Sequence, residues 1–192
     1  MARKKLDYQD LMKATEKILL EQGYGGFNFS ILAQTIGIGR STLYEYYSAK
    51  DDLIADYMKN VMDHFNADLQ VVAGHQDSKE QLQMLIQLML KYSQIHNIIK
   101  ILPLLENRSE TVIQVKEQFR QDHLDILQYV RDIIEKGKRE SIIRSEIPTD
   151  ILSMFFFNTI NDSGFLPIEE EVWADWIWNI LSKGIEPRTE KI

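Results

Sequence analysis

Apolar residues recur along this chain at the three- and four-residue spacings that gather side chains on one face of an α-helix. The first such stripe consists of Leu11, Ala14, Ile18 and Leu19, and Gly23 follows it. A second, shorter stripe consists of Phe29, Leu32, Ala33 and Ile36. No segment alternates apolar and polar residues as a half-buried β-strand would. The pattern predicts an all-α protein with about nine helices.

Residues 28–53 contain two short predicted helices joined by a tight turn. Asn28 is typical of a helix N-cap, because its side-chain oxygen can accept hydrogen bonds from the free N–H groups of the first turn. Gly37 suits the left-handed conformation that ends many helices. The second helix is expected from about Arg40 to Tyr47, with Leu43 on its inward face. This arrangement is typical of a helix-turn-helix DNA-binding motif.

Capping signals mark the two helices that follow. Ser48 and Asp51 have the spacing of a capping box, with serine as the N-cap and a carboxylate three residues later. They open a long helix that is expected to reach a break at residues 74–77. Ser78 and Gln81 have the same spacing and are expected to open the next helix.

The C-terminal part is predicted to contain three further long helices. One is expected from about Glu110 to Arg139. Its inward side chains are predicted to be Val112, Val115, Phe119, Leu124, Leu127, Val130 and Ile134. Another begins at Pro148 and ends at Gly164, and its apolar residues lie on nearly every side, which favours burial on more than one side. Pro167 precedes the last helix.

The run Thr42-Leu43-Tyr44-Glu45-Tyr46-Tyr47, followed by Lys50, resembles the end of the helix-turn-helix in the tetracycline-repressor (TetR) family of bacterial one-component regulators. The specific similarity covers roughly residues 8–57. It implies a three-helix DNA-binding domain in residues 1–50 and a helical ligand-binding and dimerisation domain in residues 51–192. Gly39 departs from the family pattern, because a serine or threonine usually caps the recognition helix there.

The resemblance implies contacts with double-stranded DNA from the recognition helix and its neighbours. The residues concerned are Asn28, Arg40, Ser41, Thr42, Tyr44, Glu45, Tyr46 and Lys50. Arg40 is the best candidate for a base contact, because a guanidinium can bond O6 and N7 of guanine together. Thr42, Tyr46 and Lys50 correspond to phosphate contacts. Two interpretations of Glu45 stay open, acceptance from the N4 amino group of cytosine or pairing with a neighbouring cation.

The last two predicted helices carry more large apolar side chains than one small core needs, which favours a subunit interface. The residues assigned to it are Met154, Phe155, Phe157, Trp173, Trp176, Ile177, Ile180 and Leu181. An ordinary monomer core is the alternative. In the resembled family these helices pair in a homodimer, and two recognition helices about 34–36 Å apart then read a palindromic operator.

A ligand pocket in the C-terminal domain is implied by the resemblance and by no motif. Candidate lining residues are large or carry a polar tip on mostly apolar helices. They are Met84, Leu88, Tyr92, Phe119, His123, Phe156 and Asn158. For each of them a core position is the alternative, because large apolar residues at helical spacing usually form the core. The expected effector is small and hydrophobic or amphipathic.

Composition and charge restrict the classes of function. The net charge is −7, but residues 1–60 contain eight basic and eight acidic residues, so the whole negative excess lies C-terminal to the DNA-binding motif. The four histidines are scattered, and no glycine-rich phosphate loop or nucleophile motif occurs, so neither an enzyme, a cofactor nor a metal site is expected. No apolar run is long enough to span a membrane, and the absence of cysteine favours the cytoplasm.

These observations predict a ligand-responsive transcriptional regulator, favoured as a repressor that an effector releases from its operator. The alternative is a helical protein-interaction module without sequence-specific DNA binding. Alanine at Arg40 and Tyr44 would separate the two, because a regulator would lose its operator and an interaction module would keep its activity.

Overall fold

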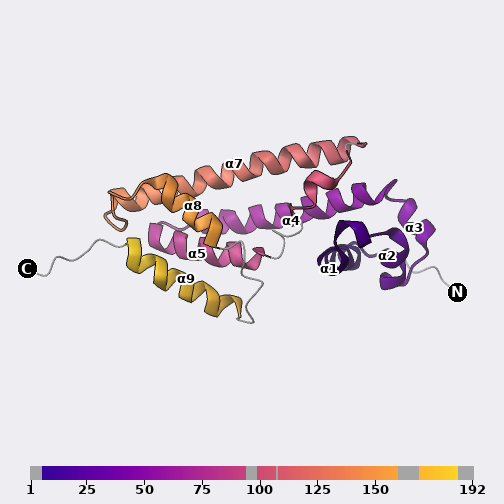
Figure 1. The fold of residues 1–192 in the computed structure, drawn as a ribbon, viewed down its shortest axis with the longest axis horizontal. Coiled ribbons are helices and arrows are strands. Elements are labelled where there is room, and N and C mark those ends of the chain that lie inside the picture. Colours follow the sequence, from indigo (N-terminus) through magenta and orange to yellow (C-terminus); the bar gives the residue numbers. More distant parts are fainter. Residues whose placement is uncertain (1–5, 94–98, 107, 160–168, 186–192) are drawn as a thin grey trace, which may run out of the picture. The chain divides into compact units, whose positions relative to one another are not determined.

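The computed structural model describes residues 6–93, 99–106, 108–159 and 169–185, and among these residues every regular element is a helix (Figure 1). The elements are α1 (Tyr8–Gly26), α2 (Phe29–Ile36), α3 (Arg40–Tyr44), α4 (Lys50–Ala73), α5 (Ser78–Lys91), the 3-10 helix η1 (Leu102–Leu104), α7 (Glu110–Arg139), α8 (Thr149–Thr159) and α9 (Glu170–Ile185). The all-α fold expected from the sequence is confirmed. The predicted C-terminal end of α8, Gly164, lies outside the described residues.

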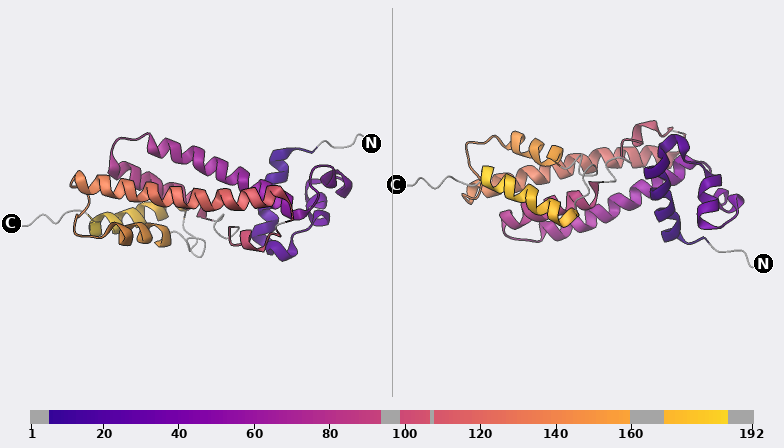
Figure 2. Two further views of the ribbon diagram at one scale, coloured as in Figure 1. Left: turned by 90° about the horizontal axis from the view of Figure 1, so that it is seen from above. Right: turned by 60° about the horizontal axis from the view of Figure 1, so that its bottom comes forward.

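The helices form two compact units. The first comprises the described residues of Met1–Asp63 and Ile95–Phe119, and the second those of His64–Gln94 and Arg120–Ile192. Both α4 and α7 therefore contribute residues to each unit, and α7 is a continuous helix of 30 residues in every view (Figures 1 and 2). The expected domain boundary between residues 50 and 51 stays a prediction.

The first unit is built around one hydrophobic core, as the stripes of apolar residues predict. Leu11 of α1, Leu32 of α2, Leu43 of α3 and Leu53 of α4 are fully buried in it. Residues before and within α7 complete this core, namely Ile101, Leu105, Val112, Val115 and Phe119. The start of α7 therefore packs with the helix-turn-helix in one unit, an association of distant segments that local periodicity does not predict.

Helix α4 begins one residue later than its predicted capping box requires. Its first helical residue is Lys50, so Ala49 occupies the N-cap position. The N–H of Ala49 donates to the carboxylate of Asp52 at 3.1 Å, the contact that the third helical residue makes in a capping box. Ser48 is therefore not the cap, and Asp51 is not the capping carboxylate. Asp51 is instead buried and accepts hydrogen bonds from more distant parts of the unit.

The start of α5 also differs from the predicted capping box. Asp77 is the N-cap, and its carboxylate accepts from the N–H groups of Lys79 and Glu80 at 2.8 and 3.0 Å. Ser78, predicted as the cap, is fully buried and donates to Glu140 of the segment after α7. Asp77 is exposed, so its carboxylate can cap the first turn and keep its contact with water.

The second unit contains the end of α4 with α5, most of α7, α8 and α9, and α9 packs along α5 (Figure 1). The buried stripe of α7 follows Phe119, Asp122, Ile126 and Val130. Leu124 was predicted to face inward but is 46% exposed, and Asp122 is 7% exposed. Two residues along a helix turn the side chain by about 200°, so Leu124 cannot share the face of Asp122.

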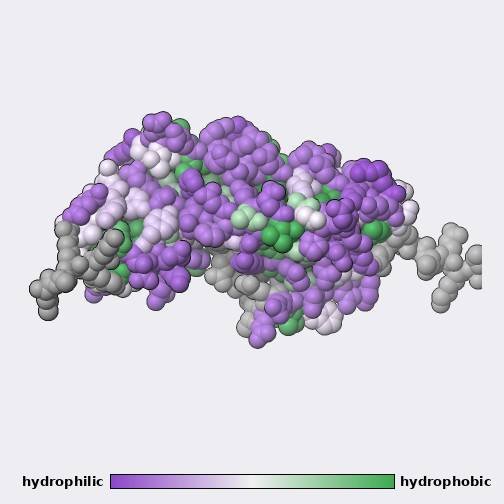
Figure 3. All heavy atoms as spheres, turned by 180° about the vertical axis from the view of Figure 1, so that it is seen from behind, coloured by the Kyte–Doolittle hydropathy of each residue, from purple (hydrophilic) through white to green (hydrophobic). Residues whose placement is uncertain are grey.

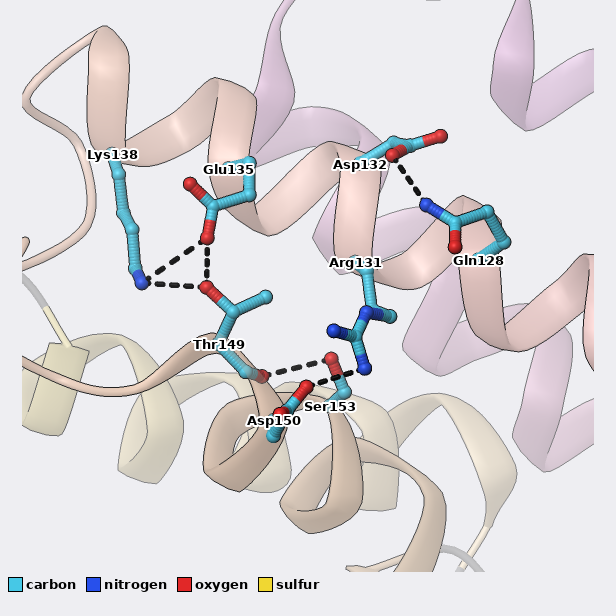
Figure 4. A network of polar contacts seen from close by, with 8 residues as sticks. All are labelled: Gln128, Arg131, Asp132, Glu135, Lys138, Thr149, Asp150 and Ser153. Atoms are coloured by element: carbon cyan, nitrogen blue, oxygen red, sulfur yellow. Dashed lines mark hydrogen bonds and ion pairs between the residues drawn. The ribbon is translucent and has the colours of Figure 1, made fainter.

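Polar contacts join the start of α8 to the last turns of α7 (Figure 4). The ammonium of Lys138 donates to the hydroxyl of Thr149 at 2.6 Å. That hydroxyl in turn donates to the carboxylate of Glu135. Arg131 forms an ion pair with Asp150. The buried residues of α8 are Leu152, Ser153 and Phe156, and they lie on one side of the helix. Within residues 149–158, the described side chains of α8, the burial on several sides that the sequence favours is not found. On the molecular face shown in Figure 3, hydrophilic side chains predominate and apolar ones are scattered.

Candidate nucleic-acid interface and effector unit

Helix α3 is presented by the packing of α2 and by a glycine turn. The side chain of Asn28 accepts from the N–H groups of Ser30 and Ile31, both at 3.0 Å, and so caps α2 as predicted. Gly37 has φ +71°, the left-handed conformation expected of it. The N-cap of α3 is Gly39, which makes no side-chain hydrogen bond. The short α3 is therefore held mainly by the burial of Leu43.

Helix α3 ends at Tyr44, three residues before the predicted end at Tyr47. The N–H groups of Tyr46 and Tyr47 both donate to the carbonyl of Leu43, at 3.0 and 2.9 Å, which closes the helix in a turn. The hydroxyl of Tyr47 donates to Asp56 of α4 at 2.6 Å. Burial, and then this hydrogen bond, hold the pKa of Tyr47 well above its usual range. Anchorage of Tyr47 to α4 thus directs the chain away from the helix axis.

The outward side of α3 carries the four residues expected to reach base edges. Arg40, Ser41, Tyr44 and Glu45 are all exposed, as predicted. One guanidinium nitrogen of Arg40 donates to the hydroxyl of Tyr44 at 2.8 Å, and the guanidinium carbon lies 5.3 Å from the centre of the Tyr44 ring. The Tyr44 ring meets Phe29 of α2 edge to face, with 5.0 Å between ring centres.

The predicted phosphate contacts lie in different environments. Tyr46 is 60% exposed. Thr42 is 5% exposed on the inner side of α3, a position from which a hydroxyl reaches DNA poorly. The ammonium of Lys50 donates to the carbonyl of Tyr24 at 2.9 Å and to that of Phe27 at 3.4 Å. Lys50 therefore binds the C-terminal end of α1 in this structure, and its DNA contact stays a prediction.

Asp51 connects three parts of the first unit, a role that the sequence did not indicate. One carboxylate oxygen accepts from the hydroxyl of Tyr24 at 3.0 Å, and the other accepts from the N–H of Glu106 at 2.8 Å. Burial, and then the hydrogen bond to Asp51, raise the pKa of Tyr24 to about 12. Local spacing assigned Asp51 to the cap of its own helix, and no local signal reveals a partner 55 residues away.

The eight residues predicted at a dimer interface fall into three groups. Met154 and Phe155 of α8 and Trp176 and Ile180 of α9 are exposed, with Ile180 at 68%. Phe157 and Trp173 are half-buried. Ile177 and Leu181 are buried within the chain, so they serve its own core. Two exposed apolar residues absent from the prediction, Ile151 and Val172, extend the exposed group.

The predicted effector-binding residues do not form one group. Phe119 belongs to the core of the first unit, while the other six belong to the second unit. Leu88 and Phe156 are buried, and Met84 is half-buried. His123 is exposed, and its ring lies 5.9 Å from that of Phe157. The amide of Asn158 is exposed and donates to the carbonyl of Met154 at 2.9 Å.

Tyr92, another predicted effector contact, has protein partners. Its hydroxyl donates to Asp68 at 2.8 Å, and its ring meets Phe65 edge to face at 5.2 Å. Lys91 donates to the same carboxylate at 2.7 Å. Burial, followed by the hydrogen bond to Asp68, raises the pKa of Tyr92 to about 12. Tyr92 therefore joins α5 to α4.

Two polar atoms in the second unit are buried and have no hydrogen-bond partner among the described residues. They are the hydroxyl of Tyr129 on α7 and the indole nitrogen of Trp173 on α9. Burial raises the pKa of Tyr129 above its usual value. Buried polar atoms are usually satisfied in folded proteins, so these two are exceptions among the described residues of the second unit. Neither residue was selected from the sequence as an effector contact.

Among the described side chains, no group of three His, Asp or Glu residues could hold a metal ion. Within the same part of the chain, none of the helices is both long and apolar enough to cross a membrane.

Comparison with known proteins identifies relatives of both the motif and the fold. Residues 11–57 match the model of bacterial regulatory proteins of the tetR family. The chain is 22% identical over 174 residues to the fatty acid metabolism regulator protein of Bacillus subtilis (strain 168), covering 85% of this chain and 84% of that protein.

Two solved structures share the fold. The ketosteroid transcriptional regulator KstR2 of Mycobacterium tuberculosis superposes with a TM-score of 0.80 at 14% identity, over 98% of this chain and all of that one. The transcriptional regulator FadR from Bacillus subtilis, in complex with stearoyl-CoA, superposes with a TM-score of 0.65 at 19% identity, over 94% and 100% of the two chains.

Proposed function

This chain belongs to the TetR family of bacterial transcriptional regulators, and from that premise we propose that it is a homodimeric repressor that leaves a palindromic operator when a small amphipathic effector binds. The observation that carries the proposal is the outward side of α3. Arg40, Ser41, Tyr44 and Glu45 are exposed there, while Leu43 fixes the helix from within. Side chains that recognise base edges in the major groove need both rigid support and exposed polar groups.

In the proposed complex, Arg40 bonds O6 and N7 of a guanine in the major groove. Ser41 and Glu45 contact neighbouring base edges, with both interpretations of Glu45 open, and Tyr44 lies beside Arg40 on the same side of α3. Tyr46 contacts a phosphate, since it is exposed beside α3. Thr42 and Lys50 are weaker candidates, because Thr42 is buried and Lys50 already binds carbonyl groups. The side chain of Asn28 is occupied as a cap, so a DNA contact there would be an additional one.

The proposed dimer interface is the exposed apolar side of α8 and α9. Its residues are Ile151, Met154, Phe155, Val172, Trp176 and Ile180. On each helix these residues share one side by their three- and four-residue spacing, and aromatic residues and methionine are enriched where interfaces are buried. Association through this side would place two recognition helices on the two half-sites of an operator.

For the effector we propose an acyl-coenzyme A thioester with a long acyl chain. The support is the similarity to a fatty acid metabolism regulator and to a fold relative that holds stearoyl-CoA. The second unit offers apolar helices for an acyl chain, and the unpartnered donors of Tyr129 and Trp173 suit the oxygen acceptors of a thioester or phosphate. Binding would favour a conformation with lower operator affinity, so that DNA release is a shift of populations.

As a regulator of this kind the protein would act without catalysis, in the cytoplasm, where the chromosome of a bacterium lies. The proposal is tested by incubating the purified protein with sheared genomic DNA and sequencing the retained fragments, with and without stearoyl-CoA. Retention of a few sites sharing an inverted repeat, lost on addition of stearoyl-CoA, is the expected result. Retention without a shared sequence, unchanged by Arg40→Ala, would favour the alternative of an interaction module. Site-specific retention that stearoyl-CoA leaves unchanged would overturn only the proposed effector class.

A further inference from the structure

Three side chains form a connected series across the recognition motif. Phe29, at the start of α2, is 4% exposed and meets the ring of Tyr44 edge to face. The hydroxyl of Tyr44 accepts a hydrogen bond of 2.8 Å from the guanidinium of Arg40, four residues earlier on α3. The series therefore runs from a buried residue of one helix to an exposed cation on the next.

The series restricts the guanidinium of Arg40. An exposed arginine has many accessible rotamers, and fixing one of them costs conformational entropy. Here the Tyr44 ring is oriented by Phe29, and its hydroxyl and its ring both contact the guanidinium. Residues four apart on a helix are neighbours, so the contact needs no distortion of α3. The cost of ordering Arg40 is thus reduced before DNA arrives.

The hydrogen bond to Tyr44 leaves Arg40 able to read a base. A guanidinium has five N–H donors and no acceptor. One donor is used by Tyr44, and two are needed for O6 and N7 of guanine. The Tyr44 hydroxyl can accept from Arg40 while the remaining donors point to DNA. The arrangement is therefore compatible with a base contact and does not compete with it.

We propose that Tyr44 is a positioning residue that holds Arg40 for recognition of one guanine in each operator half-site. The inference rests on the proposed function as a sequence-specific DNA-binding protein. A positioning role can be distinguished from a direct DNA contact by Tyr44. Loss of a positioning residue changes the preference at the base pair that Arg40 contacts. A direct base contact by Tyr44 would affect another base pair, and a phosphate contact would affect none selectively.

The test compares base preferences of the full-length wild type with those of Arg40→Ala, Tyr44→Phe and Tyr46→Phe. Each protein selects from a library of random double-stranded DNA at one fixed salt concentration. Tyr44→Phe removes only the hydroxyl and keeps both ring contacts. Tyr46→Phe is the matched control, since Tyr46 is an exposed tyrosine two residues away. Thermal unfolding of each variant verifies that the fold is intact.

We expect the wild type to prefer guanine at one position of each half-site by roughly tenfold or more. Arg40→Ala abolishes this preference. Tyr44→Phe lowers the preference at the same position by about three- to tenfold, the usual effect of losing one hydrogen bond, and leaves the dependence of affinity on salt unchanged. Tyr46→Phe lowers affinity for all sequences equally.

Three results would overturn the inference while leaving the proposed function in place. They are an unchanged base profile in Tyr44→Phe, a change at a different base pair from that of Arg40→Ala, and a uniform loss like that of Tyr46→Phe. If the wild type itself selects no shared sequence, the proposed function fails and the inference fails with it.

Discussion

The ammonium group of Lys50 lies 3.8 Å from the centre of the Tyr24 ring and donates a hydrogen bond to the Tyr24 carbonyl. This contact joins the first residue of α4 to the end of α1. A lysine placed in this way satisfies carbonyl groups that a helix end leaves free. Its role in the structure is therefore one of support, distinct from the phosphate contact expected from the family resemblance.

Replacing Lys50 by alanine is expected to lower the free energy of unfolding by about 1–2 kcal/mol, because a charge-assisted hydrogen bond and a cation–π contact are lost. Urea unfolding measures the effect. Lys59→Ala is the control, since Lys59 forms only an exposed pair with Asp63 and should change stability by less than about 0.5 kcal/mol. Unchanged stability with weakened DNA binding would show instead that Lys50 serves as a phosphate contact.

The capping arrangement of α4 predicts that replacing Asp52 lowers the stability of the protein, whereas replacing Ser48 does not. Asp52→Ala removes the acceptor of the Ala49 N–H and should cost about 0.5–1 kcal/mol. Ser48→Ala should be nearly neutral, because Ser48 lies one residue before the cap position. Thermal unfolding of both variants, under identical conditions, measures the difference. A larger loss for Ser48→Ala than for Asp52→Ala would restore the capping box predicted from the sequence.

The burial of Tyr92, together with its hydrogen bond to Asp68, predicts a dependence of stability on alkaline pH. Folding raises the pKa of Tyr92 from 10.0 to about 12, so the neutral phenol is favoured in the folded state. The resulting stabilisation is fully present below pH 10 and is lost as the pH rises through 12. Between pH 10 and 12 the wild type should therefore lose stability relative to Tyr92→Phe, because phenylalanine does not titrate. A difference that stays constant over this range would contradict the buried, hydrogen-bonded environment of Tyr92.

The exposed apolar side of α8 and α9 predicts a change of oligomeric state. Trp176→Glu and Ile180→Glu should convert the proposed dimer to a monomer and weaken operator binding at least tenfold, because a buried unpaired carboxylate is costly. Analytical ultracentrifugation measures the mass. Val71→Glu is the control, since Val71 is equally exposed but lies on α4. Dimers that persist in both α9 variants would place the interface elsewhere.

Local signals predicted the recognition motif closely. The cap at Asn28, the turn at Gly37 and the inward residues of α2 each depend on neighbours within about seven positions, and all are found as expected. Periodicity also predicted α7 from Glu110 to Arg139. Such features are readable because helix propensity, capping and the hydrophobic stripe agree over a short stretch.

The errors concern contacts between distant segments. Spacing assigned Asp51 to the cap of α4, but Tyr24 and the backbone of Glu106 bind its carboxylate. Spacing also placed Leu124 inward, although the buried stripe passes through Asp122. For Asp51 the partners lie outside its helix, and periodicity within one helix carries no information about them.

The two sides of the short helix α3 have different roles. Thr42 and Leu43 supply the burial that holds the helix, and of the four outward residues only Tyr44 touches the core of the first unit, through Phe29. Substitutions among those four positions can accumulate at little cost to folding. A lineage carrying this domain can therefore acquire new target sites by exchanging a few surface side chains, while the scaffold that presents them is inherited unchanged.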